Sequence, residues 1–168
     1  MRLFIAVQLE ENMKKAMIGV MHDLKKQGAT GNFVPAQNLH MTLAFIGEVK
    51  DAEPVKKVMH SMPPEAFRLA LDGSGFFSDL MWVGVKGNQK LKKYAADLRK
   101  ALKDAGIPCD DEKFVPHITV IRKYKGKRPN GLVIPKEEMV VKKVSLMKSE
   151  TKDGKTVYKE IAAVAAGK

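Results

Sequence analysis

The chain has 168 residues, of which 45% are hydrophobic and 29% are charged, and its single cysteine is Cys109. This length and balance predict a globular domain with a substantial core, and the lone cysteine excludes an internal disulfide and a multi-cysteine zinc site. Thirty lysines and arginines against nineteen acidic residues give a net charge of +11, which favours an anionic partner. A lysine-rich, solvated surface is the alternative explanation of that charge.

The predicted elements are, in chain order, a strand at 2–8, a helix at 12–26, a strand at 39–46, a helix at 51–60, strands at 67–71 and 81–85, a helix at 91–105, a strand at 114–121, and a hairpin of 140–148 and 156–164. Apolar residues three and four positions apart predict the helices, and Asp153-Gly154 supplies the hairpin turn. The fold class is α+β, because no Gly-x-Gly-x-x-Gly follows a strand and there is no Walker-type loop. No linker divides these elements, so residues 1–168 are expected to form one domain of two similar lobes.

The apolar runs of the chain are short. Residues 3–7 and 161–166 are the runs nearest the two ends of the sequence. Both are too short to span a bilayer, and the first is too short for a signal-peptide core. A soluble cytoplasmic protein is therefore expected.

Two predicted strands carry the same short pattern, a histidine, an apolar residue and a threonine. The pattern occurs at His40 to Thr42 and again at His117 to Thr119. Because side chains alternate between the faces of a strand, each segment offers an imidazole and a hydroxyl on one face and apolar residues on the other. A lone histidine on a strand is usually structural. The repeat in a basic chain instead predicts two strands that meet across one cleft, whereas His22 and His60 fit structural or exposed positions.

Two histidines and two threonines suit the displacement of a phosphodiester oxygen. Histidine titrates near neutral pH, so one imidazole can remove a proton from the attacking oxygen while the other protonates the leaving oxygen. Threonine hydroxyls can donate hydrogen bonds to the non-bridging phosphate oxygens as charge builds up in the transition state. This scheme requires no metal and no cofactor, and it predicts a bell-shaped dependence of activity on pH.

The segments NLHMTLAFIGEV and FVPHITVIRKY resemble the paired His-x-Thr signatures of the 2H phosphoesterases. They are most similar to those of the LigT-like RNA 2′,3′-cyclic phosphodiesterases, also called 2′-5′ RNA ligases. The resemblance extends over nearly the whole chain and includes the opening MRLFIAV and the segment GFFSDLMWVGV. One departure is Ser78-Asp79-Leu80, which stands where many relatives carry a basic segment with a proline.

The resemblance implies a bilobal, pseudo-twofold arrangement of two mainly antiparallel sheets, with helices on the outside and a central cleft, in a single 2H phosphoesterase domain. It implies hydrolysis of an RNA 2′,3′-cyclic phosphate to a 2′-phosphate. The implied partners are RNA ends of this kind, tRNA fragments included, and neither a membrane nor an obligate protein partner is expected. A monomer is sufficient for this activity.

The resemblance also assigns roles to individual residues. His40 and His117 form the catalytic pair, with His117 as the base that activates water and His40 as the acid, although coupled histidines can exchange these roles. Thr42 and Thr119 hold the phosphate. Arg122 is also assigned to the phosphate, but strict alternation places it on the opposite face from His117, so this role requires a bend or bulge in the strand.

The basic run of residues 122–128 follows the second motif and suits phosphate attraction and base stacking. Within it, Lys123 and Tyr124 are candidates for base or backbone contacts, and Phe45 is a third candidate after the first motif. For each aromatic residue, a place in the core is the alternative.

Three alternative functions compete with this one. The same site run in reverse would join a cyclic end to a 5′-hydroxyl, whereas Thr151-Lys152-Asp153-Gly154 lacks the spacer of an adenylylating ligase motif. A non-catalytic module that binds RNA ends or tRNA would also explain the charge. A metal-dependent phosphatase is disfavoured because the four histidines lack close ligand spacing such as His-x-x-x-His.

Overall fold

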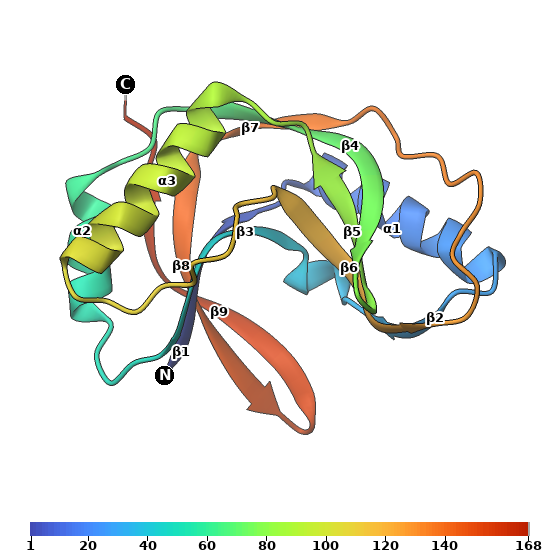
Figure 1. The fold of residues 1–168 in the computed structure, drawn as a ribbon, viewed down its shortest axis with the longest axis horizontal. Coiled ribbons are helices and arrows are strands. Elements are labelled where there is room, and N and C mark those ends of the chain that lie inside the picture. The colour runs from blue at the N-terminus through green and yellow to red at the C-terminus, as the bar shows by residue number, and fades with distance from the viewer. Residues whose placement is uncertain (168) are drawn as a thin grey trace.

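The computed structural model describes residues 1–167 and combines α-helices with a large antiparallel sheet (Figure 1), which confirms the predicted α+β class. The elements follow in the order β1 (Arg2–Gln8), α1 (Glu11–Lys26), β2 (Thr30–Phe33), the 3₁₀ turn η1 (Ala36–Asn38), β3 (His40–Glu48), α2 (Glu53–Ser61), β4 (Phe67–Phe77), β5 (Leu80–Val85), α3 (Gln89–Asp104), β6 (His117–Lys125), β7 (Glu138–Val141), β8 (Lys143–Lys152) and β9 (Lys155–Ala165).

The sheet has two parts that meet between the motif strands. Its strand order is β7-β4-β5-β6-β3-β1-β8-β9, and β2 pairs with β6 outside this path. Strands β3 and β6 share a single backbone pair, Met41 with Ile118, whereas the other neighbouring strands pair over several residues. The two parts can therefore diverge from this point and leave space between them.

The helices lie on opposite sides of the molecule (Figure 1). Helices α2 and α3 lie beside the part made of β3, β1, β8 and β9, and α1 lies beside the part made of β4 to β7. Helix α1 follows β1 in sequence but packs near β7 in the other part, so neither part is a contiguous stretch of chain. The C-terminal hairpin also completes the sheet that β1 and β3 begin.

The core is formed by the apolar faces that the sequence pattern predicts. Helix α1 buries Met13, Met17 and Leu24 completely, and Met41 and Met81 are also fully buried in strands. These methionines pack within one continuous core cluster that reaches both parts of the sheet. They fill space between the helices and the sheet, as flexible unbranched side chains do.

Several boundaries differ from the sequence predictions for physical reasons. Strand β2 was not predicted because its four residues, TGNF, are mostly exposed and two of them are poor strand formers. Strand β7 was not predicted as separate, since Lys142 interrupts what reads as one run with β8. The second motif strand begins at His117, not at residue 114, because the preceding Pro116 has no N–H for the ladder. None of the helices within residues 1–167 is long and apolar enough to cross a membrane.

Candidate active site

The two motif strands bring their polar side chains into one cavity of about 610 Å³. Strand β3 supplies His40 and Thr42, and β6 supplies His117 and Thr119. The residue between each pair, Met41 or Ile118, is fully buried on the other face. The single backbone pair between β3 and β6 is this same Met41–Ile118 pair, so the strands touch where the two motifs begin.

Each motif strand also has an irregularity directly after its threonine. Ala44 pairs with Ile5 but Thr42 pairs with Ala6, which leaves Leu43 as an extra residue. On β6, Ile121 pairs with Met81 but Thr119 pairs with Trp82, which leaves Val120 as the extra residue. An extra residue reverses the alternation of side chains beyond it.

These bulges turn two further side chains toward the cavity. Phe45 and Arg122 both line it, together with the histidines and threonines, although unbroken alternation would point them away. The bulge that a role for Arg122 requires is therefore present in β6. Its guanidinium and that of Arg2, which also lines the cavity, give the site two fixed positive charges.

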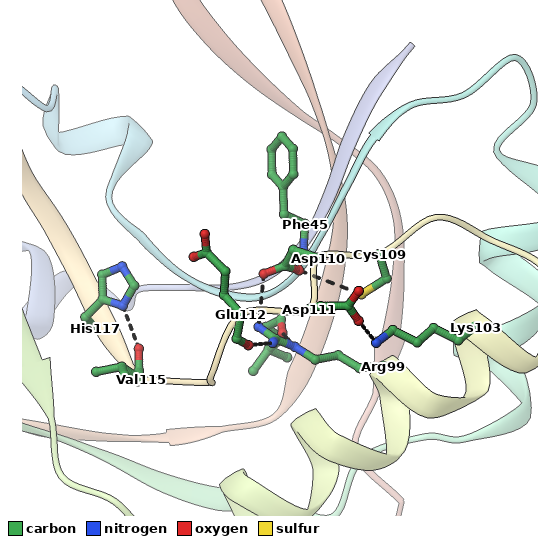
Figure 2. A network of polar contacts seen from close by, with 10 residues as sticks. Phe45, Arg99, Lys103, Cys109, Asp110, Asp111, Glu112, Val115 and His117 are labelled. Atoms are coloured by element: carbon green, nitrogen blue, oxygen red, sulfur yellow. Dashed lines mark hydrogen bonds and ion pairs between the residues drawn. The ribbon is translucent and has the colours of Figure 1, made fainter. Parts of the chain in front are cut away.

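Both histidines are held by a backbone carbonyl two residues earlier in the chain. The Nδ1 atom of His40 lies 2.7 Å from the Asn38 carbonyl oxygen, and that of His117 lies 2.6 Å from the Val115 carbonyl oxygen. Figure 2 shows the His117 contact. Because a carbonyl only accepts, Nδ1 of each ring carries the proton and donates it. In the neutral rings, Nε2 is then left free to accept a proton.

His40 is less easily protonated than an ordinary histidine. Burial lowers its pKa most strongly, and the positive charges of Arg122 and His117 lower it further, while the hydrogen bond to Asn38 opposes the shift. Its Nε2 atom lies 3.0 Å from the Thr42 hydroxyl, which can donate to the neutral ring. The free protein therefore holds His40 as a neutral imidazole near pH 7.

This lowered pKa predicts a loss of stability at acid pH that depends on His40. The unfolded chain binds a proton at His40 before the folded chain does, so the contribution is complete above about pH 6.5 and is lost as the pH falls toward the folded pKa. Urea unfolding from pH 7.5 to 5 should show wild-type protein losing unfolding free energy more steeply than His40→Gln. Equal slopes would contradict the shift, and His22→Gln, at an exposed position on α1, is the matched control.

Aromatic rings flank both histidines. The ring centroids of Phe4 and Tyr158 lie 4.9 Å from one another, and they lie 4.9 and 5.2 Å respectively from that of His40. The Phe77 centroid lies 5.2 Å from that of His117, with the rings nearly perpendicular, and the Trp82 centroid lies 6.0 Å away. These contacts restrict the rotation of each imidazole and separate it from bulk water.

Sequence reasoning missed one wall of the cavity, which the C-terminal hairpin provides. Strands β8 and β9 contribute polar side chains at every second position: Ser149, Thr151, Thr156 and Tyr158. That alternation was the available signal, but a hairpin distant in sequence from both motifs gave no reason to place it at the cleft. The buried Asn38 amide donates to the Thr156 carbonyl at 3.0 Å and so connects the hairpin to the first motif.

Two of the predicted contact residues lie elsewhere. Lys123 and Tyr124 are not among the described residues that line the cavity. The Tyr124 hydroxyl donates to the Lys127 carbonyl at 2.7 Å, and its ring stands edge-on to Phe76 at 5.0 Å. Tyr124 thus packs against β4, as the core alternative expected, whereas Phe45 lines the cavity and is 38% exposed.

An arginine on α3 ties the loop before His117 to the first motif strand (Figure 2). Arg99 donates from Nε to the Leu43 carbonyl at 3.0 Å and from Nη1 to the Glu112 carbonyl at 2.7 Å. Its Nη2 lies 3.5 Å from the Asp110 carboxylate, which accepts a hydrogen bond from the Phe45 N–H at 2.9 Å. This network holds the chain that leads to His117 against β3, and so it helps to fix how the two motifs face each other.

Arg99→Ala is expected to destabilise the fold by about 2–4 kcal/mol, because it leaves a carboxylate and two carbonyls without their charged donor. The Arg99 side chain is only 15% exposed, so water replaces the lost contacts poorly. Urea unfolding at pH 7.5 would measure the loss. Arg68→Ala, whose pair with Glu138 is largely exposed, is the control and should cost less than about 1 kcal/mol. Equal losses would show that the network adds nothing beyond a surface ion pair.

Comparison with known proteins agrees with this geometry. The model of the 2′-5′ RNA ligase superfamily matches residues 15–153. The RNA 2′,3′-cyclic phosphodiesterase of Thermotoga maritima is 31% identical over 95% of this chain and 92% of its own length. The crystal structure of E. coli LigT in its apo form superposes with a TM-score of 0.83 at 27% identity, covering 99% of this chain and 98% of LigT. LigT complexed with 3′-AMP gives a TM-score of 0.82 at 28% identity with the same coverage. The chain belongs to the 2′-5′ RNA ligase superfamily.

Proposed function

We propose that this protein hydrolyses the 2′,3′-cyclic phosphate at the 3′ end of RNA and leaves a 2′-phosphate. The observation that carries the proposal is the matched pair of histidines in one cavity, each with Nδ1 held by a backbone carbonyl and a threonine two residues on. The T. maritima relative bears the name of this activity. The net charge of +11 and the arginines at the cavity suit an RNA substrate.

In the proposed reaction, His117 removes a proton from water as the water oxygen attacks phosphorus. The bond from phosphorus to the 3′-oxygen breaks, and His40 gives that oxygen a proton, so the product has a free 3′-hydroxyl. Thr42 and Thr119 donate hydrogen bonds to the non-bridging oxygens, and Arg122 offsets their charge. After this step His117 carries an additional proton and His40 has lost one. Proton exchange with solvent then returns both histidines to their starting states.

The neutral state of His40 in the free protein fits this scheme when the substrate is considered. A phosphodiester anion beside the ring favours the imidazolium and so opposes the lowering by Arg122 and His117. Binding is therefore coupled to proton uptake at His40. Binding of the substrate thus favours the protonated form of His40, which the acid role requires.

The proposal includes three finer points. Residues 1–168 act as one 2H phosphoesterase domain, since each part of the sheet supplies one histidine to a shared cavity. The protein acts as a monomer in the cytoplasm. Its positive charge makes tRNA fragments with cyclic ends suitable substrates. The same groups run in reverse would join a cyclic phosphate to a 5′-hydroxyl as a 2′-5′ linkage, which is a side reaction of the same site.

The test is incubation of the purified protein, in the presence of a chelator, with a short RNA that ends in a 2′,3′-cyclic phosphate. Mass spectrometry should show the gain of one water, and comparison with authentic 2′- and 3′-phosphate standards should place the phosphate on the 2′-oxygen. A 3′-phosphate product would contradict the assigned leaving group. Salt-dependent binding without hydrolysis would instead support the module that binds RNA ends.

A further inference from the structure

A second, smaller cavity opens beside the catalytic pair. Its volume is about 330 Å³, and it shares Thr42 and His117 with the main cavity. We call it the His117 annex. Its other lining includes Phe77, Glu112 and Lys113, and the paired Arg99 and Asp110 line it as well. A pocket of this size is at the small end of ligand sites and sits directly next to the proposed phosphate position.

Phe77 presents an exposed aromatic ring at this annex. It is 42% exposed although it stands at the end of β4, where its ring lies edge-on to His117 at 5.2 Å. The turn that follows is fixed, because the Tyr124 N–H donates to the Asp79 carbonyl at 2.7 Å. An exposed ring held in place beside a catalytic group offers a preformed surface for a flat apolar partner.

Glu112 places a carboxylate at the same annex. Its backbone carbonyl is occupied by Arg99, but no hydrogen bond or ion pair of its side chain is found within residues 1–167. In Figure 2 the Glu112 carboxylate points away from Arg99, and no dashed line reaches it. A negative charge here repels a phosphate, but it can accept a hydrogen bond from an N–H group of the nucleoside attached to that phosphate.

We propose that the His117 annex is a nucleobase subsite, in which Phe77 packs against the base and Glu112 accepts a hydrogen bond from a base N–H. Nucleobases combine a flat π surface with N–H donors at their edge. A ribose joins each base to its phosphate, so a base site must lie next to the phosphate site, as the annex does. Lys113 adds a donor on the same wall for a ring nitrogen or carbonyl. This inference rests on the proposed function, since it takes the main cavity as the phosphate site.

The base could belong to either nucleoside that flanks the phosphate. It is the base of the cyclic nucleotide itself, or that of the 5′-hydroxyl nucleoside that occupies the other side of the phosphate in the reverse reaction. Both sources have the same chemistry. A 2′,3′-cyclic mononucleotide carries only the first nucleoside, whereas a 2′-5′-linked dinucleoside phosphate carries both.

The experiment compares a 2′,3′-cyclic nucleotide with methyl ribofuranoside 2,3-cyclic phosphate, which has the same reacting group and no base. Because Phe77 also contacts His117, the base-free compound reports the effect of Phe77→Ala on the catalytic histidine alone. Beyond that effect, Phe77→Ala is expected to raise KM for the nucleotide about 5- to 100-fold, the loss of one base–aromatic contact. Glu112→Ala is expected to raise KM for the nucleotide about tenfold and to lower KM for the base-free compound, because a repelling charge is removed. The alanine keeps the backbone carbonyl that Arg99 binds.

Controls at matched positions separate these effects from general ones. Ile18→Ala removes another exposed apolar side chain, and Glu11→Ala removes another exposed charge, both on α1 outside the two cavities. Phe77→Ala could leave the nucleotide KM unchanged and instead weaken inhibition by the 2′-5′-linked dinucleoside phosphate about 5- to 100-fold. The base in the annex is then that of the second nucleoside, and this result also supports the subsite. An equal rise in KM for the nucleotide and for the base-free compound would overturn the subsite, because Phe77 would then only position His117.

Failure of the proposed function has a different signature. If wild-type protein hydrolyses neither compound, binding of the same cyclic nucleotide measured by calorimetry still tests the annex. Weaker binding by Phe77→Ala than by Ile18→Ala would support the subsite without any turnover. Unchanged binding and unchanged inhibition in both annex variants would overturn it.

Discussion

His117→Ala is expected to lower kcat for a 2′,3′-cyclic RNA end by about 10²- to 10⁴-fold, and His40→Ala by a similar factor. Each variant removes one of the two groups that move protons in the proposed reaction, while the cavity and its arginines remain. Both rings are only partly buried at the cavity, so the variants should fold. Single-turnover rates on a labelled RNA, with circular dichroism as the check on folding, would measure the effect. His60→Ala, at an exposed site on α2, is the control.

The two variants can also assign the acid and the base. A phosphodiester with a 4-nitrophenolate leaving group needs no proton at that oxygen, so loss of the acid should cost little with this substrate. His40→Ala should therefore recover most of its rate, whereas His117→Ala should not. Recovery by His117→Ala alone would reverse the two roles, and full activity of either variant on RNA would remove the two-histidine scheme.

The pH profile provides an independent check on the same pair. Activity of the wild-type protein should be bell-shaped, with both limbs between about pH 5 and 8, because one imidazole must be protonated and the other neutral. Burial lowers the pKa of His40 in the free protein most strongly, and a bound phosphodiester anion should raise that pKa again. The optimum for kcat should thus lie at higher pH than the optimum for kcat/KM.

The parts of the fold that local pattern determines could be predicted from the sequence. The three helices appear within three residues of the predicted boundaries, because their apolar faces and their breakers are all local. The hairpin turn at Asp153-Gly154 was also predicted, and both of its residues adopt positive φ, 52° and 76°. The repeated His-x-Thr pattern was enough to predict that two strands meet at one cavity.

Other features depend on contacts between distant segments and gave no local signal. The bulges at Leu43 and Val120 are visible only in the register against β1 and β5, yet they decide that Phe45 and Arg122 face the cavity. The hairpin wall around Tyr158 depends on the pairing of β8 with β1. Arg99 reads in the sequence as one more cation on an amphipathic helix, because nothing local indicates the carbonyls that it binds.

Trp82 illustrates how small residues that lie far from the motifs in sequence shape the site. A Cβ atom on Gly75 would lie 2.5 Å from the Trp82 ring, and one on Gly84 would lie 2.3 Å from the Asp72 carbonyl and 3.3 Å from that ring. Both glycines therefore leave the room in which the indole packs beside His117 and Phe77. The sequence segment that contains them was part of the family resemblance, and this packing gives it a physical reason.

Thr119→Val is expected to lower kcat by about 10²- to 10³-fold, the loss found when one preorganised hydrogen-bond donor to a developing charge is removed. Valine has the shape of threonine and suits a strand, so the change removes the hydroxyl with little effect on packing. KM should change less than kcat, since the hydrogen bond strengthens as charge develops on the phosphate oxygens. Steady-state rates on a fluorescent cyclic-phosphate RNA would measure both constants. Thr30→Val, on β2, is the control, because the Thr30 hydroxyl donates to the Lys125 carbonyl away from the cavity.

Thr42→Val should cost more than Thr119→Val, because the two hydroxyls are not equivalent. The Thr42 hydroxyl lies 3.0 Å from Nε2 of His40, so its loss removes a contact to the acid as well as a donor to the phosphate. The pH profile of Thr42→Val should shift on the limb that His40 controls, and that of Thr119→Val should keep the wild-type shape. Combining Thr42→Val with His40→Ala should cost less than the sum of the two, as residues in one network do. Strict additivity would mean that Thr42 acts on the phosphate alone, and the internal asymmetry of the two motifs would then have no part in catalysis.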